Sequence, residues 1–212
     1  MIIFKLVTAI ALGYLLGAIP CAYLAGRLVK GVDIRRVGGG NVGTLNTLRE
    51  IGLVPGLLVL LLDVSKGSLS VLIARWLGLE VVWVFAAGFA AIVGHNWPVF
   101  LRFQGGKGAA TTLGVLLPLA PIQFAISLGV MLVLIVITSN IRLAVVVGLA
   151  LLPLIIWLFH GPPMVIYYTI ALTLFLILRS LPGVRREMAR AGDKKGIVVD
   201  KKHHFWQARK NR

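Results

Sequence analysis

Long apolar runs, separated by short polar or glycine-rich stretches, make up most of the chain. Most of these runs approach the roughly 20 residues that an α-helix needs to cross a bilayer, and one is shorter, at roughly 16 Å as a helix. The pattern predicts an all-α integral membrane protein with about seven transmembrane segments. The segments are expected at 3–28, 53–77, 81–93 (or on to 103), 109–119, 122–138, 143–159 and 164–178.

Prolines and glycines mark where the later segments end. Pro118 and Pro121 interrupt the chain after the short segment, because proline lacks the N–H that continues a helix. The GPP run at 161–163 predicts a tight turn between the last two segments. The first segment loosely fits a signal peptide. We interpret it as a retained helix instead, because its apolar run continues to Leu24.

The composition excludes a soluble domain. Hydrophobic residues are 58% of the chain, charged residues are 14%, and the mean hydropathy is +0.94. Such a chain has too little polar surface to cover a soluble fold. The net charge of +15 could also suit nucleic acid, but the basic residues cluster at the ends of apolar runs, which is typical of membrane orientation and of anionic headgroups. No nucleic-acid partner is expected, and the single cysteine, Cys21, excludes an intrachain disulfide.

The distribution of basic residues predicts the orientation. Seven segments put the two termini on opposite sides, and an outside N-terminus places the stretches 31–52, 94–108 and 179–212 in the cytoplasm. The last of these stretches holds eleven Lys or Arg, so this orientation satisfies the positive-inside rule. Reading 109–138 as one span would put that basic stretch outside. We therefore expect a membrane domain over 1–180 and a basic cytoplasmic tail over 181–212.

The stretch 94–114, GHNWPVFLRFQGGKGAATTLG, carries the strongest indication of chemistry. Glycines in its GGKG run at 105–108 leave backbone N–H groups uncovered, and successive N–H groups form a concave anion site. Lys107 adds a positive charge. A helix expected to begin at Ala109 points its N-terminus at the same place, which also favours an anion. These features together predict phosphate binding at the membrane surface.

A second glycine-rich loop, 31–52, lies on the same predicted face. Its GGGN run at 38–41 has the flexibility to wrap an anion, and Asn46 offers an amide donor and acceptor. Arg49 offers a planar fork suited to phosphate. Alone, such a loop is more often a flexible connection whose arginines follow the positive-inside rule. Two basic glycine-rich loops on one face favour a shared anion site.

Several of the ionisable residues within or at the ends of the predicted segments need an explanation. Asp63 and Lys66 are three apart, so they share a helix face and can pair. Ionisable residues inside a membrane are costly and are usually paired or functional, so the pair either orients a loop or serves a site. His95 is a candidate general base near neutral pH, although a role in fixing the loop is favoured. Arg75 is expected to extend outward to the membrane surface.

The motifs GGGNVGTLNTLR, LLDVSKG and GHNWPVFLRFQGGKGAATTLG resemble those of the bacterial acylphosphate:glycerol-3-phosphate acyltransferases, the PlsY family. The resemblance runs from about residue 10 to residue 180, and the block at 94–111 is highly specific. It implies a multi-pass enzyme of phospholipid synthesis in the bacterial inner membrane. Such an enzyme transfers a fatty acyl group from acyl phosphate to glycerol 3-phosphate, giving lysophosphatidic acid and phosphate.

The resemblance also implies roles for particular residues. The expected partners are acyl phosphate, glycerol 3-phosphate and membrane lipids, and no metal or other cofactor is expected. The expected catalytic residues are Arg49, Lys107 and His95. The expected substrate-binding residues are Gly38, Gly39, Gly40, Asn41, Asn46, Gly105, Gly106, Gly108, Thr111 and Arg179.

The chain departs from the family pattern in two motifs. Gly39 stands where the family usually has serine, and Thr44-Leu45 precede Asn46. A third motif usually carries a histidine, an arginine, a glutamate and an asparagine, of which only Arg179 remains. A non-catalytic or divergent paralogue is therefore an alternative. A membrane transporter of a phosphorylated anion is another, although the outer halves of the segments offer few ionisable residues for a polar path.

Overall fold

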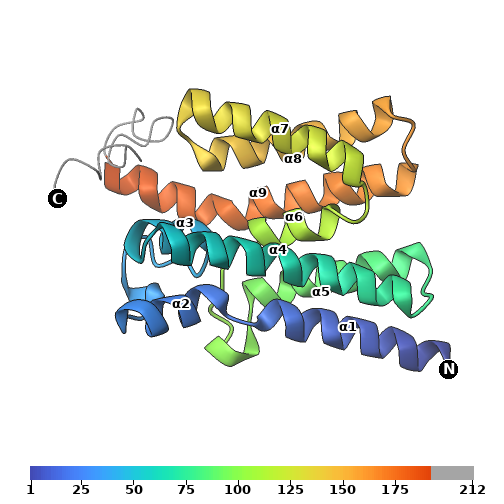
Figure 1. The fold of residues 1–212 in the computed structure, drawn as a ribbon, viewed down its shortest axis with the longest axis horizontal. Coiled ribbons are helices and arrows are strands. Elements are labelled where there is room, and N and C mark those ends of the chain that lie inside the picture. Colours follow the sequence, from blue (N-terminus) through green and yellow to red (C-terminus); the bar gives the residue numbers. More distant parts are fainter. Residues whose placement is uncertain (192–212) are drawn as a thin grey trace. The chain divides into compact units, whose positions relative to one another are not determined.

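The computed structural model describes residues 1–191, with side chains to 182, and these residues form helices and connecting turns (Figure 1). The chain divides into two units, Met1–Pro121 and the residues from Ile122 on. The elements in chain order are α1 (Ile2–Ala18), α2 (Cys21–Lys30), η1 (Ile34–Arg36), α3 (Thr44–Glu50), α4 (Leu53–Trp76), α5 (Val81–Asn96), η2 (Val99–Leu101), α6 (Ala109–Leu116), α7 (Pro121–Thr138), α8 (Ile141–Leu158) and α9 (Pro163–Ala191).

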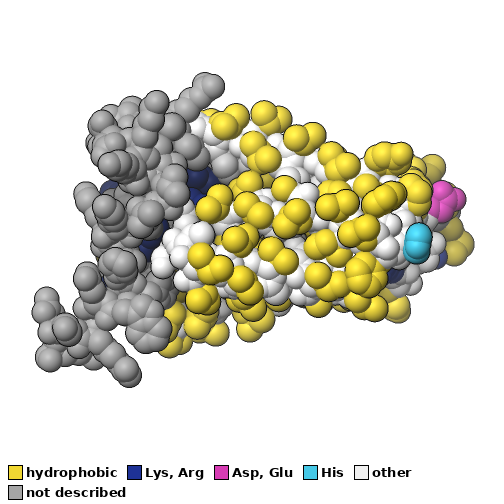
Figure 2. Space-filling view, turned by 90° about the horizontal axis from the view of Figure 1, so that it is seen from above, with side chains coloured by type: hydrophobic (Ala, Val, Ile, Leu, Met, Phe, Trp, Pro, Cys, Tyr) yellow, Lys and Arg dark blue, Asp and Glu magenta, His cyan; other side chains and the backbone are white. Residues whose placement is uncertain are grey.

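The predicted all-α membrane fold is confirmed. Among the described residues, six helical stretches are long and apolar enough to cross a membrane, and Ala109–Leu119 is a shorter apolar stretch. Figure 2 shows a face on which hydrophobic side chains predominate, as contact with lipid requires. The six long stretches are Ile2–Lys30, Leu53–Trp76, Val81–Leu101, Pro121–Thr138, Ile141–Leu158 and Pro163–Pro182.

The first stretch is broken, whereas the sequence predicted one continuous segment over 3–28. Proline disfavours helical backbone at the preceding residue, and Ile19 accordingly has φ −58° and ψ 117°. α1 therefore ends at Ala18, and α2 begins after Pro20. The break leaves the Ile19 carbonyl outside the helical ladder, where it accepts a hydrogen bond from Lys66 Nζ at 3.2 Å.

Small residues let the helices of the first unit approach closely. Gly13 and Gly17 of α1 face the backbone carbonyls of Ala87 and Ala91 in α5, where any side chain would collide. α4 and α6 make the same kind of contact, in which Gly67 and Gly114 each face the backbone of the opposite helix. Figure 1 shows α1, α4 and α5 running alongside one another. This packing fixes the short α6 against α4.

Basic side chains close helix ends in the first unit. Lys5 Nζ donates to the carbonyl of Leu77 at 3.0 Å, at the end of α4. Arg75 donates to the carbonyl of Pro118 at 2.8 Å, beyond the end of α6. Cations at helix C-termini satisfy carbonyls that have no partner within the helix. Arg75, which was expected to extend outward, is exposed, and it also links α4 to the residues that follow α6.

The second unit consists of α7, α8 and α9. Ser127 of α7 donates to the carbonyl of Gly148 in α8 at 2.8 Å, and Thr173 of α9 donates to that of Leu149 at 3.4 Å. α9 continues past the predicted segment end at 178 and includes Pro182, although proline disfavours a helix interior. Good helix formers such as Arg, Glu, Met and Ala follow it. Of the predicted tail, 192–212 lies outside the described residues.

Candidate active site

The first glycine-rich loop folds around the buried side chain of Asn46. Its Nδ2 donates to the carbonyls of Ile34 and Val37, both at 3.1 Å. Its Oδ1 accepts the N–H of Gly39 at 3.0 Å. The amide, expected at the substrate, therefore makes three bonds to the backbone of its own loop. Asn46 therefore fixes the shape of the loop, and the loop in turn presents the neighbouring polar groups.

The three glycines of this loop have different surroundings. Gly38 and Gly40 have φ of +58° and +68°, in the left-handed region that favours glycine. Gly39 lies outside that region, and a Cβ there would meet only Asn46 Oδ1, at an ordinary 3.8 Å. Asn41 is half-buried after the turn, and Arg49 is exposed on α3.

A charged cluster at the start of the loop was not predicted from the sequence. Arg35 binds both oxygens of the Asp33 carboxylate, at 3.0 and 2.7 Å. The hydrogen bonds from Arg35 lower the pKa of Asp33 to about 2, so this carboxylate stays ionised throughout the neutral range. The guanidinium groups of Arg27 and Arg35 also lie 5.4 and 5.3 Å from the ring centre of Tyr23. The sequence Asp-Ile-Arg at 33–35 was the pattern that could have indicated this ion pair.

The second glycine-rich loop follows the end of α5. The turn after η2 puts Arg102 and Phe103 at φ of 52° and 61°. The N–H groups of Gly105 and Gly106 donate to the carbonyls of Asn96 and His95, at 3.2 and 3.1 Å. These two N–H groups are therefore not the uncovered anion donors that the sequence predicted, because the end of α5 already uses them.

The two loops meet at Gly106. A Cβ on this residue would collide with the carbonyl oxygen of Val42, in the first loop, and with Nε2 of His95. Lys107 follows, half-buried, and Gly108 at φ +85° caps α6. The predicted juxtaposition of the two glycine-rich loops is therefore present within the first unit, with the N-terminus of α6 directly after the contact.

Buried polar groups surround the start of α6. The side chains of Asn96, Thr111 and Thr112 are at most 1% exposed, and their polar atoms have no hydrogen-bond partner. Asn96 Oδ1 lies beside Gly108, since a Cβ built there would be 2.8 Å from it. Unpaired buried polar groups are costly, and in native proteins they usually have a functional or solvent partner. These groups and the N-terminus of α6 make the place suitable for an anion.

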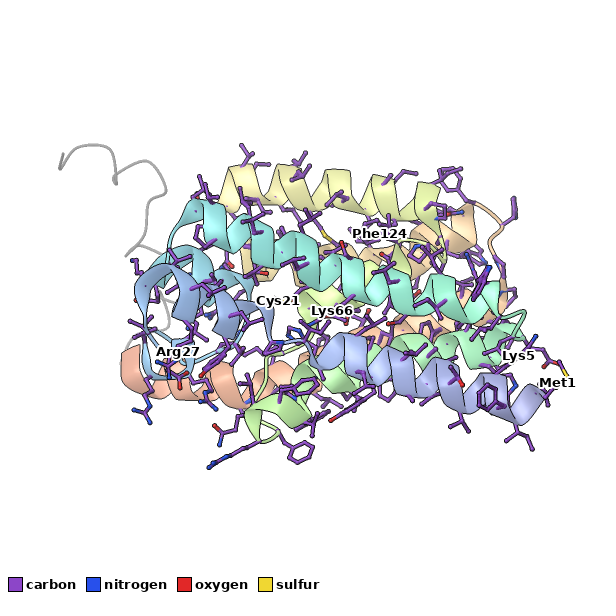
Figure 3. All side chains as sticks on the ribbon, turned by 60° about the horizontal axis from the view of Figure 1, so that its bottom comes forward. Met1, Lys5, Cys21, Arg27, Lys66 and Phe124 are labelled. Atoms are coloured by element: carbon purple, nitrogen blue, oxygen red, sulfur yellow. The ribbon has the colours of Figure 1, made fainter. Side chains whose placement is uncertain are left out.

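Asp63, Lys66 and His95 form a buried ionic cluster behind the second loop. Lys66 Nζ lies 2.9 Å from Asp63 Oδ1, as an ion pair rather than an aligned hydrogen bond. His95 Nδ1 lies 3.6 Å from the same oxygen. A cavity of about 10 Å³, the space of one water molecule, adjoins all three residues at the break in the first span. Figure 3 shows Lys66 next to Cys21, which also lines this cavity.

Comparisons with known proteins identify the family. The family model described as glycerol-3-phosphate acyltransferase matches residues 7–190. The chain belongs to this family. The glycerol-3-phosphate acyltransferase 2 of Moorella thermoacetica is 43% identical over 188 residues, which cover 89% of this chain and 96% of that protein. The glycerol-3-phosphate acyltransferase 1 of Dehalococcoides mccartyi is 37% identical over 198 residues, covering 91% and 95%.

A solved structure supports the same assignment. The glycerol 3-phosphate form of PlsY, an integral membrane glycerol 3-phosphate acyltransferase, matches with a TM-score of 0.79 at 33% identity, covering 87% of this chain and 92% of that chain. The lysophosphatidic acid form matches with a TM-score of 0.76 at 31% identity. The predicted resemblance is confirmed. Among the predicted site residues of this acyltransferase, only Arg179 belongs to the second unit, where it lies in α9.

Proposed function

We propose that this acyltransferase transfers a fatty acyl group from acyl phosphate to glycerol 3-phosphate, and that it releases lysophosphatidic acid and phosphate. The contact of the two glycine-rich loops at Gly106 carries the proposal, because it unites the basic Lys107 and the start of α6 with the loop at 38–46. Both substrates carry a phosphate, so that a site made of two anion-binding loops suits the pair. The acyl chain can stay in the bilayer while its head reaches the loops.

The proposed chemistry needs positioning more than acid–base catalysis. Acyl phosphate is an activated anhydride, so that the glycerol hydroxyl attacks the acyl carbon and phosphate leaves with the electron pair of the broken C–O bond. Lys107 and Arg49 would neutralise the phosphates, and the loops would hold the hydroxyl against the carbon. A substrate phosphate can accept the hydroxyl proton. His95 is then not required as a base.

The pH–rate profile of a His95→Ala variant tests this mechanism. A substrate phosphate as acceptor predicts that the variant keeps the shape of the wild-type profile, even if its rate falls. Loss of one limb of the profile, with a rate lowered by orders of magnitude, would identify His95 as the base instead.

We also propose that the protein lies in the bacterial inner membrane with its N-terminus outside and its basic tail in the cytoplasm. The proposal rests on the distribution of Lys and Arg among the connections. Single cysteines at positions 160 and 200, in a Cys21→Ala background, test it. An impermeant thiol reagent should label position 160 in intact cells, and labelling of position 200 would contradict the orientation.

An assay with purified protein tests the activity directly. Palmitoyl phosphate and radiolabelled glycerol 3-phosphate should give labelled lysophosphatidic acid, whereas palmitoyl-CoA should not replace the acyl phosphate. Lys107→Ala is the matched control for contaminating activity. Absence of product from folded protein would favour the divergent or non-catalytic paralogue that the altered motifs at Gly39 and Arg179 suggest.

A further inference from the structure

A buried ionic cluster inside a membrane protein is costly, and the proposed chemistry does not use this one. Asp63, Lys66 and His95 are 1%, 4% and 7% exposed. Charged side chains in such surroundings are almost always paired. In some proteins they are retained because they fix the position of other groups. The question is what this cluster holds in place.

His95 connects the cluster to the second glycine-rich loop. One edge of its ring, Nδ1, faces the Asp63 carboxylate at 3.6 Å. The other edge, Nε2, faces Gly106 so closely that a Cβ on that glycine would collide with it. The carbonyl of His95 also accepts the N–H of Gly106 at 3.1 Å. His95 therefore supports the loop with both its ring and its backbone, and Asp63 is the group that faces the opposite edge of that ring.

Lys66 anchors the other side of the cluster. Its Nζ contacts both Asp63, at 2.9 Å, and the carbonyl of Ile19, at 3.2 Å, where the first span is broken. Asp63 is thus held by Lys66, one turn further along α4, and Lys66 is itself held at the break between α1 and α2. The cluster joins α4, α5 and the break between α1 and α2 to the second glycine-rich loop. Because the Asp63 carboxylate is fixed, it gives the imidazole ring of His95 a fixed orientation.

We propose that Asp63 is a positioning residue, which acts through His95 to hold the loop 105–108 in the shape that binds the phosphate of glycerol 3-phosphate. The identity of the ligand rests on the proposed function, whereas the effect on the loop does not. An ion pair with a purely structural role would stabilise α4 but would leave the loop unchanged when both of its charges are replaced by apolar groups.

A pair of charge-free variants separates these two roles. Asp63→Leu with Lys66→Met removes both buried charges, so that neither is left unpaired in the membrane. Asp63→Asn with Lys66→Met is equally uncharged but keeps an oxygen that can accept from His95 Nδ1–H. Ser70→Ala is the control on the same helix, because the Ser70 hydroxyl donates only to the carbonyl of Lys66 among the contacts described, at 2.7 Å.

The expected kinetic result is a change in KM. The leucine double variant should raise KM for glycerol 3-phosphate about tenfold, the equivalent of one hydrogen bond to a charged group, with a much smaller change in kcat. The asparagine double variant should restore most of the affinity, and Ser70→Ala should behave as wild type. An equal KM in both double variants would overturn the proposal, because the acceptor oxygen would then make no difference.

Hydrogen exchange over residues 94–114 gives a readout that needs no turnover. The amides of Gly105 and Gly106 should exchange faster in the leucine double variant than in wild type, the asparagine double variant or Ser70→Ala. Unchanged exchange in folded leucine double variant would overturn the proposal even if activity fell. An inactive wild-type protein would refute the proposed function alone, since the exchange measurement would still decide whether Asp63 holds the loop.

Discussion

The two glycine-rich loops look alike in sequence but use glycine for different physical reasons. In the loop at 38–40, Gly38 and Gly40 adopt positive φ, and the space around Gly39 is open. In the loop at 105–108, Gly105 and Gly106 have no such backbone angle, yet a Cβ on either would collide with backbone atoms of neighbouring segments. Gly38 and Gly40 of the first loop are needed for their backbone conformation, and a Cβ on Gly38 would also meet the side chains of Asn46 and Glu50. In the second loop Gly108 shares this requirement, with φ +85°, whereas Gly105 and Gly106 are needed for space.

This difference predicts how each loop responds to substitution. Where a turn needs glycine only for its left-handed backbone, another residue that tolerates this backbone can replace it at a cost of about 1 kcal/mol. A close contact between backbones has no such tolerance, because the opposing carbonyl cannot rotate away as a side chain can. The second loop should therefore be the more sensitive of the two to substitution at Gly105 or Gly106.

Gly106→Ala should have the largest effect. The added methyl group would push the loop away from Val42 and from His95, and a shift of about 1 Å can lower a rate about a hundredfold. Overpacking should also lower the free energy of unfolding by about 1–3 kcal/mol. Turnover and thermal unfolding in detergent measure both effects. Wild-type kinetics in this variant would mean that the two loops need not touch for catalysis.

Lys107→Ala should lower turnover by about 10- to 150-fold while leaving the protein folded. Removal of a charge-assisted contact to phosphate costs about 1.5–3 kcal/mol, and each 1.36 kcal/mol is about a factor of ten.

Arg49→Lys is the matching change in the first loop, and it should also be damaging, because a point charge cannot replace a bidentate fork. Steady-state kinetics with both substrates decide the matter. Near-normal kinetics in either variant would remove that residue from the site.

Local patterns of the sequence predicted much of the fold and part of the site. Apolar runs predicted the helices, because every backbone group must find a partner inside a bilayer. The spacing of Asp63 and Lys66 predicted their pairing, since residues three apart share a helix face. Glycine and lysine runs predicted that 31–52 and 94–108 lie on one face and share an anion site. Gly106 indeed lies against Val42, and the shared anion site stays a prediction.

Contacts between distant segments could not be predicted in this way. His95 was a candidate base on the strength of its residue type, but its distance to Asp63, 32 positions earlier in the chain, depends on how α4 and α5 pack. The N–H groups of Gly105 and Gly106 were expected to be uncovered, because no local pattern shows that the end of α5 turns its carbonyls toward them. Pro20 was a local signal for the broken first span, and it was outweighed by the continuous apolar run.

Asn46→Ala should destabilise the first loop. The change leaves the N–H of Gly39 and the carbonyls of Ile34 and Val37 without their present partner. Each lost bond to a buried group costs about 1–3 kcal/mol, reduced where water can replace the amide. We expect a lower midpoint of thermal unfolding together with a raised KM for substrate. A change in KM without any change in unfolding would instead indicate that Asn46 also contacts the substrate.

Gly40→Ala and Gly39→Ala form a matched pair within the first loop. Alanine at position 40 must adopt φ near +68° and would lie 3.0 Å from the carbonyl of Arg35, which should cost about 1–2 kcal/mol of unfolding free energy. Alanine at position 39 meets no such restriction and should be close to neutral. Thermal unfolding of the two variants, side by side, tests whether conformation is what this loop requires of its glycines.

Gly39→Ser should have the smallest effect on the fold and a specific effect on activity. The backbone can accommodate a serine at this position, since Gly39 does not have a positive φ and a Cβ there meets nothing closer than 3.8 Å. The added hydroxyl could donate to a bound phosphate, an interaction worth up to about 1.5–3 kcal/mol, of which desolvation of the hydroxyl returns a part. We therefore expect a several-fold rise in turnover over a range of substrate concentrations, with unchanged thermal unfolding, if this chain is a weakened member of its family. No change from an already high wild-type rate would show that other groups have replaced the serine. A loss of activity in a folded variant would show instead that the loop has been rebuilt around glycine, and that space at Gly39 matters to the substrate even though it does not matter to the fold.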